Sequence, residues 1–97
     1  DCGAIGILIE KTTGKKSINN FGKPSDLMAD YISKILRKEI NKTVVGDRIH
    51  TDIELGKKLG ADTVLVCSGE YQPSTDKNHS IKDTQIFNTL TDYLITV

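Results

Sequence analysis

Apolar residues recur with a helical period in two segments of the first third of the chain. Over residues 2–13 they fall on one helical face, and Gly14 with the two lysines after it is typical of a helix C-terminus. A second apolar stripe, from Leu27 to Leu36, has the spacing i, i+1, i+4, i+5, i+8, i+9. The pattern therefore predicts a helix over 2–13 and then an amphipathic helix with Pro24 at its first position.

Two short β-branched runs, 43–46 and 63–67, show no alternation of apolar and polar residues. Continuous apolar runs of this length are typical of strands that are buried on both faces. Between them, Thr51 and Glu54 have the spacing of a capping box, which predicts a helix over 51–59 that opens at the threonine. The middle of the chain therefore has the pattern strand, helix, strand.

The last third of the chain is less regular. Residues 69–80 are polar without periodicity and predict a loop. A short helix is expected near 83–90, followed by a final strand over 93–97. Helices that alternate with strands of the buried type predict right-handed βαβ units. The fold class is therefore α/β, with a parallel sheet of three strands and flanking helices.

Composition narrows the class of protein and of partner. The chain has 97 residues, enough for one small domain, with 37% hydrophobic and 27% charged residues, which excludes both a membrane span and a disordered tail. Thirteen basic and thirteen acidic residues cancel, which argues against nucleic acid and acidic lipid as partners. The two cysteines, Cys2 and Cys67, are too few for a disulfide framework, and a cytoplasmic location is expected.

Two acidic residues follow the first predicted strand. In open parallel sheets, ligands bind beyond the carboxyl ends of the strands, and Asp47 stands at such an end. Asp52 lies in the first turn of the helix that follows and would face the same crevice. Each aspartate also has a purely structural interpretation: Asp47 could make local turn hydrogen bonds, and Asp52 could stabilise the helix dipole.

Lys23 is the candidate cation for the same crevice. It lies between Gly22, which permits a close turn, and Pro24, which fixes the direction in which the chain enters the amphipathic helix. The lysine is therefore held at a defined position before that helix. Its structural interpretation is a solvated surface lysine.

The order of these motifs resembles a known family. Segment 22–25 (Gly-Lys-Pro-Ser) followed by segment 45–53 (Val-Gly-Asp-Arg-Ile-His-Thr-Asp-Ile) is similar to the third and fourth motifs of the haloacid dehalogenase superfamily, in its 4-nitrophenylphosphatase and phosphoglycolate phosphatase branch. Segments 60–66 and 91–95 also look like that branch. The resemblance implies that residues 1–97 form the C-terminal part of a Rossmann-like core.

The resemblance also implies an activity and a role for each candidate residue. The parent protein would be a magnesium-dependent phosphatase that hydrolyses a small phosphorylated metabolite. Lys23 would bind the transferring phosphoryl group, and Asp47 would be a ligand of Mg²⁺. Asp52 would orient Lys23 or a metal-bound water, so Lys23 and Asp52 are the expected catalytic residues.

One motif of the family is missing from this sequence. The superfamily's nucleophile and general acid lie in an Asp-x-Asp-Gly segment, and no Asp-x-Asp occurs here. The nucleophile strand and the cap domain would belong to an N-terminal part of the same protein, so the isolated chain is expected to be inactive. A strand at 43–47 without its neighbour would also leave an open edge, which predicts self-association into homo-oligomers.

Three alternatives compete with this reading. The first is a non-catalytic module that functions only in association with another polypeptide. A receiver-type signalling domain is disfavoured, because only one predicted helix separates Asp47 from Ser68. A nucleotide-binding loop at 13–17 is disfavoured as well, because its first glycine would fall at Ile9.

Overall fold

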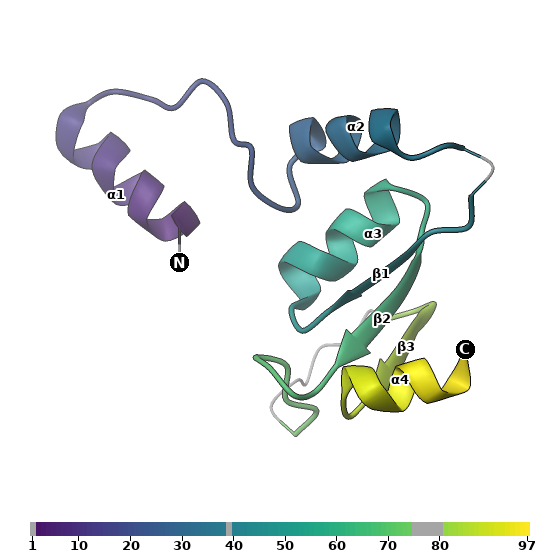
Figure 1. Ribbon diagram of the computed structural model, residues 1–97. Coiled ribbons are helices and arrows are strands. Elements are labelled where there is room, and N and C mark those ends of the chain that lie inside the picture. The colour runs from purple at the N-terminus through teal and green to yellow at the C-terminus, as the bar shows by residue number, and fades with distance from the viewer. Residues whose placement is uncertain (1, 39, 75–80) are drawn as a thin grey trace.

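A three-stranded parallel sheet forms the centre of the protein (Figure 1). The computed structural model describes residues 2–38, 40–74 and 81–97. In the order in which they lie in the sheet, the strands are β1 (Thr43–Gly46), β2 (Asp62–Val66) and β3 (Thr84–Phe87). The predicted α/β class and the parallel sheet are confirmed.

Helices α3 (Glu54–Lys58) and α4 (Leu90–Thr96) cover the two faces of this sheet. The other described helices are α1 (Cys2–Thr13), α2 (Asp26–Ile35) and the short π-helix η1 (Ile49–Ile53). On one face, Gly56 of α3 packs against Val44 and lies so close to Thr63 that a side chain at position 56 would overlap the threonine. On the other, Tyr93 of α4 meets Phe87 edge to face, with ring centroids 5.4 Å apart.

The core lies where β2 meets these helices. Every residue of β2 except Asp62 is buried, as expected for a central strand covered on both faces. In the register of the sheet, Val64 of β2 lies between Val45 of β1 and Gln85 of β3. The buried apolar residues are Ala29, Ile53, Leu55, Val64, Leu65 and Val66. The predicted strands at 43–46 and 63–67 are thus confirmed to within one residue.

The first helix is confirmed over its predicted range but stands apart from the sheet. In Figure 1, α1 is joined to α2 by a long extended segment. Gly14 ends the helix with φ of 69°, a conformation that glycine adopts without strain. None of the residues of α1 is buried, and Ile5, Leu8 and Ile9 are each more than half exposed. Neither α1 nor any other helix within the described residues is long and apolar enough to cross a membrane.

The C-terminal elements differ from the sequence prediction. The helix expected near 83–90 is strand β3, and the strand expected over 93–97 is helix α4. The strand forms because Thr84 pairs with Thr63 of β2, with their hydroxyl oxygens 2.6 Å apart, so that sheet pairing decides the conformation. The helix follows because Thr89 and Asp92 form a capping box that local apolar patterning did not reveal.

Two helix starts also differ from the prediction. No capping box forms at Thr51: the helical turns begin earlier, at Ile49, and the Thr51 hydroxyl is buried without a hydrogen-bond partner. Pro24 precedes the second helix instead of opening it, because Ser25 is the N-cap and accepts a hydrogen bond from the Met28 amide at 3.2 Å. Of the predicted loop, residues 75–80 lie outside the described residues.

Candidate active site

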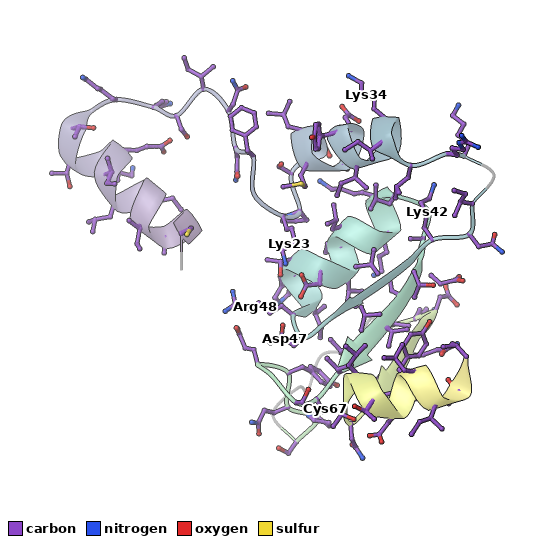
Figure 2. All side chains as sticks on the ribbon, in the orientation of Figure 1. Lys23, Lys34, Lys42, Asp47, Arg48 and Cys67 are labelled. Carbon is purple, nitrogen blue, oxygen red and sulfur yellow. The ribbon has the colours of Figure 1, made fainter. Side chains whose placement is uncertain are left out.

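The candidate residues gather beyond the carboxyl end of β1. Asp47 follows the last residue of this strand, and the chain then turns into η1, which carries Asp52. Lys23 reaches the same place from the segment before α2 (Figure 2). The parallel sheet thus brings together groups that are up to 29 residues apart along the chain.

Lys23 and Asp52 form a direct ion pair. The Lys23 Nζ donates to Asp52 Oδ1 at 2.5 Å. The Asp52 side chain is only 8% exposed, whereas that of Lys23 is 52% exposed. The buried carboxylate is therefore the fixed partner of the ion pair, while the exposed ammonium keeps N–H donors for other ligands.

Asp52 is held in place by the backbone around it. Its Oδ2 accepts a hydrogen bond from the Arg48 amide at 3.2 Å. Gly46, at the end of β1, lies against the same carboxylate, and any side chain at this position would overlap it. A glycine is therefore required here by close approach and not by backbone conformation. Together these contacts fix the orientation of the carboxylate that meets Lys23.

Asp47 is oriented by the loop that follows β2. Its Oδ2 accepts a hydrogen bond from the Glu70 amide at 2.7 Å, and its backbone carbonyl accepts one from the Tyr71 amide at 3.0 Å. Gly69 packs so closely on the Asp47 carboxylate that a side chain there would overlap it. These contacts join two loops that lie 23 residues apart in sequence. Among the described residues, these contacts leave the second carboxylate oxygen of Asp47 to other ligands.

All three predicted residues line one cavity. Its volume is about 560 Å³, and its wall includes Lys23, Asp47 and Asp52 together with Arg48. The remaining lining residues are Cys2, Gly3, Ala4, Asn20, Gly22 and Thr51. The first turn of α1 thus forms one side of the cavity. A pocket of this size is large enough for a small polar molecule.

The donor set at Asp47 suits a hard cation such as Mg²⁺. A carboxylate oxygen is its preferred protein ligand, and Mg²⁺ usually takes one or two carboxylates and completes its octahedron with waters and phosphate oxygens. Within residues 2–38, 40–74 and 81–97, no three acidic, histidine or cysteine side chains cluster as a metal site. Asp47 therefore fits such an ion as one ligand of an incomplete set.

Sequence reasoning missed two residues beside the site. Arg48 forms an ion pair through its Nε with Oε2 of Glu70, so the loops after β1 and β2 are joined by side chains as well as by backbone. Arg48 was visible only as part of a motif, and Glu70 only as part of a polar loop. The signal that could have found Glu70 is its place just beyond the carboxyl end of β2, at the same sheet edge as Asp47.

A comparison with protein families shows to which family this chain is related. A family model described as HAD-hydrolase-like matches residues 20–93, which include every candidate site residue. The chain belongs to the HAD-like hydrolases. The resemblance seen in the motifs around Lys23 and Asp47 is thereby confirmed.

Relatives of known name within the HAD-like hydrolases include several phosphatases. A dihydroxyacetone phosphatase of Corynebacterium glutamicum is 30% identical over 91 residues, which are 93% of this chain and 33% of the relative. The ribonucleotide monophosphatase NagD of Escherichia coli K12 is 38% identical over 69 residues, or 70% of this chain and 27% of the relative. The chain thus spans about a third of the length of these relatives.

Solved structures of HAD-like hydrolases have the same fold over nearly the whole chain. The p-nitrophenyl phosphatase of Archaeoglobus fulgidus superposes with a TM-score of 0.74 at 30% identity, covering 98% of this chain and 38% of the other. The 4-nitrophenylphosphatase of Thermotoga maritima gives a TM-score of 0.75 at 37% identity, covering 96% and 36%. The fold is therefore that of part of a HAD-like phosphatase.

Proposed function

We propose that this chain is the phosphate- and metal-binding part of a magnesium-dependent phosphatase that acts on small phosphate monoesters. The observation that carries the proposal is the ion pair between Lys23 and the buried Asp52, in a cavity that also contains the Asp47 carboxylate. The names of the relatives and of the solved structures support the same activity.

Lys23 would bind the phosphoryl group of the substrate. Its ammonium has three donors, of which one is occupied by Asp52, so the others can meet phosphate oxygens. Negative charge develops on those oxygens during transfer, and a pre-positioned cation stabilises that charge without further reorganisation. Asp52 would contribute by holding Lys23 in the required position.

Asp47 would be the metal ligand. Its carboxylate is half-buried beside the cavity, and the Glu70 amide fixes one of its oxygens. Bound Mg²⁺ would supply charge neutralisation at the phosphate oxygens. The other protein ligands of the ion and the attacking carboxylate would come from polypeptide outside these 97 residues, since no Asp-x-Asp occurs in the sequence.

The isolated chain is accordingly expected to be inactive. The test incubates the purified 97-residue chain with 4-nitrophenyl phosphate and MgCl₂ and measures release of 4-nitrophenol. The expected rate equals that of a sample without protein. A magnesium-dependent rate above this background would contradict the proposal that the nucleophile lies elsewhere.

The parent protein, with this chain in place, tests the role of Lys23. Lys23→Gln removes the ammonium and is expected to lower kcat/KM for 4-nitrophenyl phosphate by about 100-fold or more, as for loss of one charge-stabilising donor. Lys34→Gln is the matched control, because Lys34 is an exposed lysine of α2 well away from the site (Figure 2). Equal activity of the two variants would contradict the assignment of Lys23.

A further inference from the structure

The side chain of Glu70 takes no part in the proposed reaction, yet it lies between the loops after β1 and β2, which shape the site. Its backbone amide donates to Asp47 Oδ2, and its carboxylate pairs with Arg48, the residue directly after Asp47. Glu70 therefore contacts the proposed metal ligand through its backbone and that ligand's cationic neighbour through its side chain.

Arg48 is a potential competitor for the Asp47 carboxylate. A guanidinium offers five donors in a geometry that matches a carboxylate, and both side chains line the same cavity. A carboxylate that binds a guanidinium has fewer lone pairs and less net charge to offer to a metal ion. The Arg48–Glu70 ion pair directs Nε of the guanidinium to another acceptor.

The net charge of Asp47, Arg48 and Glu70 also bears on metal binding at Asp47. Asp47, Arg48 and Glu70 together carry one net negative charge, which favours a divalent cation at Asp47. With Glu70 neutral, the charges of Asp47 and Arg48 would cancel. The pair is also partly exposed, at 43% for Arg48 and 62% for Glu70, so solvent screening makes the expected effect moderate.

We propose that Glu70 is a positioning residue for metal binding: by pairing with Arg48 it keeps the guanidinium from occupying the Asp47 carboxylate. This inference rests on the proposed function, because it assumes that Asp47 is a metal ligand. It predicts that loss of the Glu70 charge weakens metal binding, and that removal of Arg48 in addition restores it. A residue that only stabilises the loop would not show this rescue.

The test is a Mn²⁺ titration of the ¹⁵N-labelled parent protein, with this chain in place and with paramagnetic broadening of the backbone amides of residues 46–52 as the readout. Glu70→Gln is expected to weaken Mn²⁺ binding about three- to fivefold, the upper range for a partly exposed ion pair. Arg48→Gln alone should not weaken it, and the double variant should bind as the unaltered parent protein does. Glu54→Gln, in an exposed pair with Lys57, is the matched control and should change nothing.

The possible results separate the two proposals. If Mn²⁺ does not broaden these amides in the unaltered parent protein, the metal role of Asp47 fails and the inference fails with it. If Mn²⁺ binds but Glu70→Gln has no effect, only the inference is overturned. It is also overturned if the double variant binds as weakly as Glu70→Gln, because Glu70 would then act by holding the loop and not through Arg48.

Discussion

Gly46 is the position at which a single methyl group should disturb the site most. The carboxylate and Cβ of Asp52 occupy the space that a Cβ at Gly46 would need. Gly46 ends β1 without a positive φ, so alanine meets no backbone strain there. Considered by backbone conformation alone, Gly46→Ala would stabilise the chain, because alanine loses less entropy on folding. We expect the opposite.

The magnitude follows from the contacts around Asp52. Overpacking a closely packed position typically costs about 1–3 kcal/mol. Displacing Asp52 also weakens its bonds with Lys23 and Arg48, which contributes about 1 kcal/mol after allowance for the half-exposed lysine. The entropic gain from alanine offsets about 0.5–1 kcal/mol. Gly46→Ala is therefore expected to lower the free energy of unfolding by about 2 kcal/mol.

Urea unfolding followed by circular dichroism measures this change, and hydrogen exchange at the Arg48 amide reports whether its bond to Asp52 is lost. Gly6→Ala is the control, because a Cβ at Gly6 of α1 would meet no atom within 4 Å. Its unfolding midpoint should equal or exceed that of the unaltered chain. A midpoint for Gly46→Ala at or above that of the unaltered chain would refute the close approach on which this reasoning depends.

Two further predictions concern α1 and the state of the isolated chain. The Ser17 hydroxyl and amide donate to the Glu10 carboxylate at 2.6 and 2.8 Å and lower the pKa of Glu10. These hydrogen bonds should therefore be complete above the pKa that Glu10 has in the unfolded chain, and they should be lost as the pH falls through its lower pKa in the folded chain. A pH titration of the Ser17 amide by NMR measures this loss, and Ser17→Ala should raise the pKa of Glu10. With Leu8 of α1 exposed and β1 at a sheet edge among the described strands, the chain should self-associate, and sedimentation as a monomer at all concentrations would contradict this.

The sequence was sufficient to predict elements whose local pattern and tertiary environment agree. The apolar run of β2 is continuous because both of its faces are covered. The stripe from Leu27 to Leu36 matches α2, although Tyr31 and Ile35 stay exposed and the buried residue of this helix is Ala29. The predicted conformations of residues 84–87 and 90–96 were wrong, because short apolar segments fit a strand or a helix equally well. Pairing with β2 and the capping box at Thr89 decide between them.

For the candidate site, sequence reasoning could predict which groups belong together but not what supports them. The positions of Lys23, Asp47 and Asp52 follow from sheet topology and motif resemblance, and the structure brings all three to one cavity. The contact of Glu70 with Arg48 depends on how two loops approach each other in space. Such an approach leaves no periodic pattern in the sequence, so it is seen only in the folded protein.

The two partners of the Lys23–Asp52 pair are anchored to different parts of the protein. Asp52 is fixed against β1 by Gly46, whereas Lys23 lies on the lead-in to α2, which is held on α3 by the ion pair between Asp26 and Lys58 at 2.7 Å. A displacement of α2 along α3 would therefore withdraw the cation and leave the anion where it is. Residues on the outer side of a surface helix can in this way set the reach of the ammonium without touching the bound molecule.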